Sequence, residues 1–184
     1  LRKYSDIIFE PNQGILLDQK YGMFPHVTRS TTTAEKPMEF IKNILSLNGI
    51  VHVHRYDISR IYHTRHGAGP FDIFPIELKN TENESNITNT YQREFKVSKL
   101  DLRLLNYAMT VNNRFFTDVS NSTVIFTCLD QITTEKIEFV DLDGTEKSEN
   151  LIDFLSRISN NSRVNTKFAT SSNPLMNLIY HCYV

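Results

Sequence analysis

The sequence is poor in cysteine and has no long hydrophobic run. Its two cysteines, Cys128 and Cys182, form neither a CxxC pair nor another metal-ligand spacing, so a disulfide framework or a zinc site is not expected. No apolar stretch approaches the roughly 18 residues that span a bilayer, and the first residues lack the apolar core of a signal peptide. These absences predict a cytoplasmic protein without a membrane partner.

The sequence also lacks an excess of either charge. Lysine and arginine total 20 against 21 aspartate and glutamate residues, which gives a net charge of -1. Without a basic field there is nothing to attract a nucleic-acid backbone, so no nucleic-acid partner is expected. Hydrophobic residues make up 40% and charged residues 22% of the 184 positions, which is typical of a folded chain. The length predicts a single domain over residues 1–184.

Neither common nucleotide fingerprint is present. The chain contains no GxxxxGK[ST] phosphate loop and no GxGxxG motif, so the motifs alone do not indicate nucleotide binding. His52 and His54 would share one face of a strand, but no carboxylate or cysteine stands at a suitable spacing to complete a metal site. No metal ligands are therefore predicted.

Strand-like and helix-like segments alternate along the chain. The hydrophobic periodicity predicts strands at residues 6–10, 50–56, 58–64, 123–129, 137–140 and 164–169, and helices at 37–48, 100–112, 151–158 and 174–180. Residues 141–144 are expected to form a turn. Because 123–129 is rich in β-branched residues, it predicts a strand that is buried on both faces. The order indicates an α/β fold with a mostly parallel sheet flanked by helices.

Three polar or glycine-containing loops follow strand-like segments, at residues 13–14, 67–70 and 170–173. In open α/β sheets, ligands bind in the crevice beyond the carboxyl ends of the strands, where such loops meet. The alternative is that glycine and proline only turn the chain at these points. The pattern leaves both interpretations open.

Two blocks of sequence resemble the adenylosuccinate synthetase family. FEPNQGILLD at residues 9–18 resembles the family pattern FEGAQGxLLD, and the match continues from Gly22 through Pro25, Val27 and Thr28 to the threonines at 32 and 33. TRHGAGPF at residues 64–71, followed by EL at 77–78, is similar to TRVGxGPFPTEL. The two blocks occur in the family's order and at its spacing.

Weaker similarities follow in the same order. TYQREFK at residues 90–96 and LDL at 100–102 resemble TTGRPRRCGWLDL, TCLD at 127–130 resembles the guanine-reading TKLD, and TSSN at 170–173 stands in the place of STGP. The chain departs from the family at two of these positions, since Lys96 replaces an arginine and Cys128 replaces the lysine of TKLD. Lysine keeps the positive charge but lacks the planar fork that binds a carboxylate at two points.

The resemblance implies a P-loop-NTPase-like adenylosuccinate synthetase fold without its N-terminal part. It also implies a set of ligand-binding residues, each carried over from a matching motif position. Residues Gln13, Thr28, His66, Gly67 and Arg93 would bind IMP; Arg93 and Thr90 would bind aspartate; Lys96, Asp130 and Ser171 would bind GTP. No catalytic residue is assigned, because the family's catalytic base and phosphate loop lie in the N-terminal part.

The implied function is the GTP-dependent ligation of IMP and aspartate in AMP biosynthesis, with Mg²⁺ neutralising the transferring phosphoryl group. By itself the chain is expected to be catalytically incomplete. Its expected partners are a purine nucleotide such as IMP and either a second copy or a separate N-terminal half. Two alternatives remain: a non-catalytic purine-nucleotide-binding or regulatory module, and a remnant whose loops keep these residues only to hold the backbone.

Overall fold

The computed structural model describes residues 6–11, 13–48, 52–79, 88, 90–91, 93–116, 122–162, 165–169 and 179–181. Its contacts divide the chain into two compact units, Leu1–His52 with Thr110–Thr117 and Val53–Met109 with Asp118–Val184. Within the described residues, no helix has the length and apolarity that a membrane crossing requires.

The first unit consists of a long loop and helices. The loop contains a 3-10 helix, η1 (Ile15–Leu17), and leads into α1 (Glu35–Asn48), which confirms the helix predicted from Pro37 onwards. The prediction of a buried strand at residues 6–10 is wrong, because the described residues there form no strand and Ile8 is 91% exposed. Without hydrogen-bonding partners, a strand-like sequence does not by itself form a strand.

The first sheet of the second unit is mostly parallel, as predicted. It contains β1 (Arg55–Arg60), β4 (Ser122–Thr127), β7 (Asn165–Ala169) and β8 (Ile179–His181) in the order β1-β4-β7-β8. β1 pairs with β4 and β4 with β7 in parallel, and β8 returns antiparallel to β7. A helical turn was expected at residues 174–180, but Ile179 and Tyr180 belong to β8 and pair with β7.

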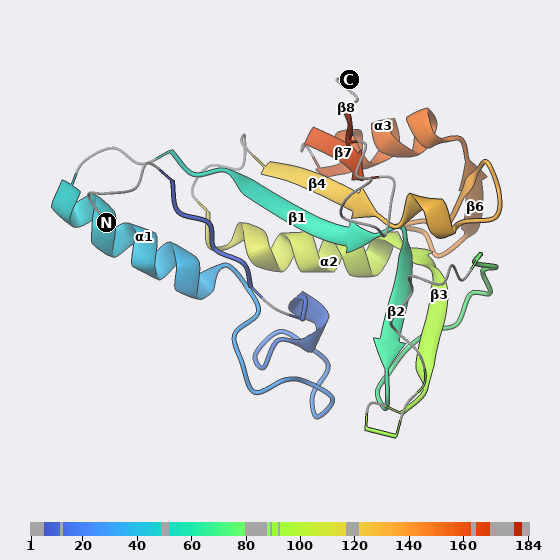
Figure 1. Cartoon of the computed structure of the whole chain (residues 1–184), viewed down its shortest axis with the longest axis horizontal. Helices are drawn as coiled ribbons and strands as arrows, with labels where there is room; N and C mark the ends of the chain where they lie inside the picture. The colour runs from blue at the N-terminus through green and yellow to red at the C-terminus, as the bar shows by residue number, and fades with distance from the viewer. Residues whose placement is uncertain are drawn as a thin grey trace. The chain divides into compact units, whose positions relative to one another are not determined.

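The second sheet is mixed, in the order β2-β3-β5-β6. Its strands are β2 (Tyr62–His66), β3 (Phe95–Asp101), β5 (Ile137–Val140) and β6 (Glu146–Glu149). β2 follows the end of β1 at a sharp angle and forms an antiparallel ladder with β3 (Figure 1). β3 runs parallel to β5, and β5 is antiparallel to β6.

Three helical segments complete the second unit: the first part of α2 (Leu102–Asn113), the 3-10 helix η2 (Leu129–Gln131) and α3 (Leu151–Ser162). The core forms around Phe154 of α3, whose ring lies 5.3 Å from that of Phe126 on β4 and 5.2 Å from that of Phe139 on β5. All three side chains are fully buried. α3 therefore packs against both sheets and confirms the helix predicted at 151–158.

The chain changes from strand to helix at Asp101. Residue Leu100 was expected to open a helix, but it lies in β3 opposite Phe139 of β5. The Asp101 carboxylate accepts the backbone N–H of Arg103 at 2.9 Å, which is the geometry of a helix N-cap. α2 consequently begins at Leu102.

Candidate functional site

Gln13 lies at a sharp reversal of the chain in the first unit. Its φ is 65° and that of Gly14 is 83°, so two consecutive residues adopt backbone conformations that L side chains rarely take. The turn continues into η1, where the Leu17 N–H donates to the Gly14 carbonyl at 3.1 Å. The Gln13 side chain is exposed, so an incoming ligand can reach it.

Asp18 holds this loop together, although sequence reasoning gave it no role. Its fully buried carboxylate accepts the backbone N–H groups of Thr32 at 2.6 Å, Lys20 at 2.8 Å and Tyr21 at 3.2 Å. Burial alone would raise the pKa of Asp18, but these backbone donors outweigh burial and lower the pKa. Asp18 is the last residue of the block that matches FEGAQGxLLD, and that position could have identified it from the sequence.

Two further bonds bring Thr28 and Gln13 into the same loop. The Thr28 N–H donates to the Leu17 carbonyl at 2.8 Å, and the Thr32 hydroxyl donates to the Gly14 carbonyl at 2.9 Å. The Thr28 hydroxyl lies 3.3 Å from that of Ser30. The two predicted IMP residues of the first unit are thus fixed on one hydrogen-bonded scaffold.

His66 and Gly67 lie at the far end of the β2–β3 ladder in the second unit. His66 is opposite Phe95, and the two rings are 4.8 Å apart. Gly67 has a φ of 70°, and its N–H donates to the Glu94 carbonyl at 2.9 Å. This end of the ladder therefore presents a histidine and an adjacent backbone turn side by side.

Arg65 closes the glycine loop that follows β2. Its Nε and Nη2 atoms donate to the Ala68 carbonyl at 3.2 and 3.0 Å, so the guanidinium lies across the loop. Gly69 has a φ of 122°, and a Cβ atom at that position would be 2.1 Å from Arg65 Nη2. A side chain at position 69 would be strained at this φ and would also displace the Arg65 guanidinium, which gives a physical reason for the glycine in this part of the matched motif.

The β2–β3 hairpin also includes or adjoins the predicted site residues Thr90, Arg93 and Lys96. Arg93 has a φ of 64° and is exposed two positions before β3 begins, and Thr90 is exposed in a turn. Lys96 is opposite Arg65 in the ladder, whereas His66 is opposite Phe95. Because successive side chains in a strand point to opposite faces, Lys96 faces away from His66. Lys96 is therefore on the opposite face of the ladder from the predicted IMP residue His66.

Asp130 lies in η2, just beyond β4. The preceding Cys128 is buried with a φ of 62°, and its carbonyl accepts the Gln131 N–H at 3.1 Å. The Gln131 side-chain amide donates to the Asp130 carboxylate at 3.2 Å. The buried Gln131 thus orients the half-buried Asp130 carboxylate in a tight turn. A carboxylate held in this way can accept hydrogen bonds from the N–H groups of a ligand.

β2 separates the η2 turn from His66. Ile61, which immediately precedes β2, donates to the carbonyl of Thr127 at the end of β4, so the turn at 128–131 lies by the start of β2. His66 ends this five-residue strand. At about 3.3 Å per residue the strand spans about 13 Å. The predicted guanine residue and the predicted IMP residues of the second unit are therefore at opposite ends of one strand.

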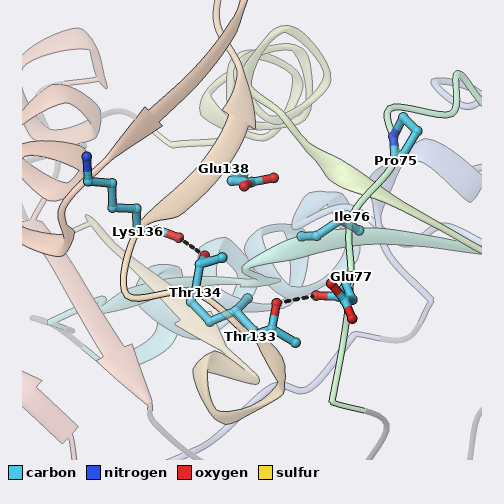
Figure 2. Close-up of a pocket in the computed structure, with 8 residues that line it drawn as sticks. Pro75, Ile76, Glu77, Thr133, Thr134, Lys136 and Glu138 are labelled. Carbon is cyan, nitrogen blue, oxygen red and sulfur yellow. Dashed lines mark hydrogen bonds between the residues drawn. The ribbon is translucent and has the colours of Figure 1, made fainter.

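An open pocket of about 470 Å³ lies between the segments at 75–77 and 132–138 (Figure 2). It contains none of the predicted site residues. The Thr133 hydroxyl donates to the Glu77 carbonyl at 3.3 Å, and the Thr134 hydroxyl donates to the Lys136 carbonyl at 2.7 Å. The Thr133 bond joins the two segments, and the Thr134 bond closes a turn within 132–138. Both hydroxyls bond to the backbone and are not directed at a ligand.

Two predictions have no structural counterpart in the described residues. Ser171, expected to contact GTP, lies outside them. Within the part of the chain that the structure describes, no group of three or more histidine, cysteine, aspartate or glutamate side chains could hold a metal ion. No such cluster among the described residues therefore marks a place for the Mg²⁺ that the resemblance implies.

Comparisons with known proteins agree with the sequence motifs. The chain is 35% identical over 120 residues to the adenylosuccinate synthetase of Thermus thermophilus and 32% identical over 118 residues to that of Deinococcus deserti. These matches cover 60% and 58% of this chain but 27% of each relative. The chain therefore matches about a quarter of the length of these relatives.

A solved structure supports the fold. It is described as fully ligated adenylosuccinate synthetase from Plasmodium falciparum, and it is similar with a TM-score of 0.55 at 18% identity, over 89% of this chain and 47% of that protein. The family model for adenylosuccinate synthetase matches residues 1–140. Since that match covers most of the sequence, the chain belongs to the adenylosuccinate synthetase family.

Proposed function

We propose that this protein takes part in purine nucleotide biosynthesis by binding IMP in the manner of an adenylosuccinate synthetase. The family reaction uses GTP to phosphorylate the purine 6-oxygen of IMP, after which aspartate displaces that phosphate. In this proposal Gln13 contacts the purine ring and Thr28 the phosphate of IMP, and His66, Gly67 and Arg93 also bind IMP. Arg93 and Thr90 also contact aspartate.

The arrangement around Asp18 supports this proposal most directly. Three backbone N–H groups and one hydroxyl converge on one buried carboxylate. The Thr32 hydroxyl also bonds to the Gly14 carbonyl and the Thr28 N–H to the Leu17 carbonyl, so the Gln13 turn is held against the Thr28 segment. Preorganising two polar side chains in this way reduces the entropy that a ligand would otherwise lose on binding. A loop that served only to connect two elements would not need a buried ionised group.

The second ligand in the proposal is GTP, with Asp130 accepting the N–H donors of guanine and Lys96 and Ser171 contributing further contacts. The length of β2, about 13 Å, separates Asp130 from His66 and supports separate positions for guanine and IMP. Lys96, opposite Arg65, lies nearer to the His66 end. Mg²⁺ would neutralise the transferring phosphoryl group. The ligands for that ion are assigned to no residue of this chain.

Complete turnover, in this proposal, requires the part of the family fold that lies outside the matched region. That part would come either from a separate polypeptide or from a further copy in a homodimer. The isolated chain is expected to bind IMP without converting it.

Calorimetric titration with IMP tests the proposal. The chain should bind IMP saturably, and Gln13→Ala and Thr28→Ala should each weaken binding at least tenfold. Gln19→Ala is the matched control, because Gln19 is an exposed glutamine of the same loop and contributes only its backbone N–H to the Ser30 carbonyl. Absence of binding at millimolar IMP, or equal losses in Gln13→Ala and Gln19→Ala, would overturn the proposal.

A further inference from the structure

The outer end of the β2–β3 ladder joins two aromatic rings. His66 ends β2 and Phe95 begins β3, and the two residues are directly opposite each other. Their ring centroids are 4.8 Å apart, and the ring planes are inclined by 37°. At this separation two aromatic rings attract each other beyond the effect of the area that they bury. The Phe95 ring therefore favours one orientation of the His66 ring over others.

The register of the ladder brings these two rings together. The Gly67 N–H donates to the Glu94 carbonyl at 2.9 Å, which marks Gly67 and Glu94 as a hydrogen-bonded pair. The neighbouring pair, His66 with Phe95, is then of the non-hydrogen-bonded kind, in which the Cα atoms are about 4.5 Å apart and the side chains are closest. The Phe95 N–H accordingly donates to the Thr88 hydroxyl at 3.1 Å. The ring contact thus follows from the backbone pairing on both sides of it.

The orientation of the His66 ring decides what the ring can offer to a ligand. His66 is half-buried, and its Nδ1 atom is buried. A ligand can therefore reach only the Nε2 nitrogen of the ring. A hydrogen bond weakens steeply as its angle departs from linear, so rotation of the imidazole changes the bond that Nε2 can form. A neighbour that fixes the ring therefore also fixes this bond.

Both members of the pair depart from the family patterns. TRVGxGPF has valine at the position of His66, and TTGRPRRCG has arginine at the position of Phe95. A chain with the two pattern residues would have no aromatic contact at this place. The two departures are far apart in the sequence but meet at one pair of the ladder. This meeting indicates that the two side chains act together in this chain.

We propose that Phe95 is a positioning residue for His66, whose imidazole it holds at the angle from which Nε2 contacts IMP. This role rests on the proposed function, since it adds a supporting residue to the IMP-binding group of the second unit. Phe95 itself makes no contact with IMP. Its effect on affinity passes through the imidazole and disappears when His66 is replaced.

A double-mutant cycle on IMP affinity tests the proposal. Calorimetry on the whole chain should show that Phe95→Leu weakens IMP binding about three- to tenfold, which is the advantage that an aromatic pair gives to one arrangement. In the His66→Val background, Phe95→Leu should change the dissociation constant by less than about twofold. Phe95→Tyr keeps the ring and should bind IMP as wild type does.

Phe74→Leu is the matched control. Phe74 is a half-buried phenylalanine beside β3, and its backbone bonds to Ser98 and Lys99. This variant should leave IMP affinity unchanged. NMR spectra without ligand give a second readout, since the ring protons of His66 lose the ring current of Phe95 in Phe95→Leu. Their chemical shifts should change in Phe95→Leu and stay as in wild type in Phe74→Leu.

The possible outcomes separate the positioning role from IMP binding itself. If Gln13→Ala weakens IMP binding but Phe95→Leu does not, the proposed function holds and the positioning role is wrong. Equal losses from Phe95→Leu with and without His66→Val would also overturn the role, because Phe95 would then contact the ligand itself. Unchanged His66 ring shifts in Phe95→Leu would remove the contact on which the role depends. Absence of IMP binding by wild type would overturn both proposals.

Discussion

The carboxylate of Asp18 accepts the backbone N–H of Thr32 at 2.6 Å and joins two parts of the chain that are fourteen residues apart. The contact is fully buried, where an N–H group without an acceptor destabilises the fold most. The Asp18 side chain therefore joins the two ends of the loop, beside the backbone bonds that also hold it.

Replacing Asp18 should damage both stability and binding. Asp18→Ala leaves three backbone N–H groups without their acceptor, which should lower the free energy of unfolding by about 2–4 kcal/mol. IMP affinity should fall with it, because Gln13 and Thr28 lose their common support. Urea denaturation and calorimetry measure the two effects. Asp143→Ala, in an exposed turn, is the control and should change the free energy of unfolding by less than half as much. Equal losses in Asp18→Ala and Asp143→Ala would contradict the role of Asp18.

Gly22 should tolerate no side chain. A Cβ atom there would lie 2.6 Å from the carbonyl oxygens of both Leu16 and Asp18, and these backbone atoms cannot move cheaply. Gly22→Ala should therefore destabilise the protein by about 2–3 kcal/mol. At Gly14 the space is open, but φ of 83° with ψ of 155° is a conformation that essentially only glycine adopts, so Gly14→Ala should cost about 1–3 kcal/mol. Thermal unfolding of both variants measures the two losses, and an unchanged melting temperature in Gly22→Ala would contradict this account.

His63 should make stability depend on pH. Burial lowers its pKa to about 4 from 6.5, although the nearby Asp101 acts to raise it. Its Nδ1 atom accepts the Asp101 N–H at 3.4 Å, so the neutral ring is the folded form. Between pH 6.5 and 4 the His63 imidazole is protonated in the unfolded chain but not in the folded chain. The free energy of unfolding therefore falls as the pH decreases through this range, by about 3 kcal/mol in total.

Urea denaturation at a series of pH values tests this dependence. His63→Gln should flatten the slope between pH 6.5 and 4, because glutamine does not titrate. His54→Gln, at an exposed position, should leave the slope as in wild type. An unchanged slope in His63→Gln would show that other groups titrate in this range.

Asp130 should select the base of the nucleotide. A carboxylate accepts two N–H donors from guanine, whereas the corresponding edge of adenine lacks that pair. Asp130→Ala should weaken GTP binding at least tenfold and leave ATP binding unchanged, as measured by competition with a fluorescent nucleotide. Gln131→Leu should cause a smaller loss, since it removes only the amide that orients the carboxylate. Equal losses for GTP and ATP would contradict a role in reading the base.

Long periodic segments could be predicted from the sequence, and polar or unpartnered ones could not. The apolar positions of α1, α3 and β4 indicated each element correctly, because periodicity reports directly which face is buried. β6 has the sequence EKSE, which carries no hydrophobic signal, and its pairing with β5 is set by the turn at 141–144. Residues 6–10 have a strand-like sequence, but strand formation depends on partners that sequence periodicity does not reveal.

The candidate site divides in a similar way. Gln13, Thr28 and the 65–70 loop came from motif resemblance, and the hydrogen bonds give physical reasons for several of those motif residues. Asp18 and the contact of Phe95 with His66 involve distant or unremarked positions, so neither could be derived from local pattern. The strand Phe95–Asp101 was missed because its last two residues resemble the start of the helix that follows.

The length of β2 also limits what a single inhibitor can do. A compound that contacts both Asp130 and His66 must bridge about 13 Å of strand, which is longer than a purine base with its ribose. Small mononucleotide mimics would therefore compete at one end of the hairpin and leave the other end accessible. A two-headed molecule would need a linker of matching length, and its gain in affinity over either half would measure how rigidly β2 and β3 hold the two ends apart.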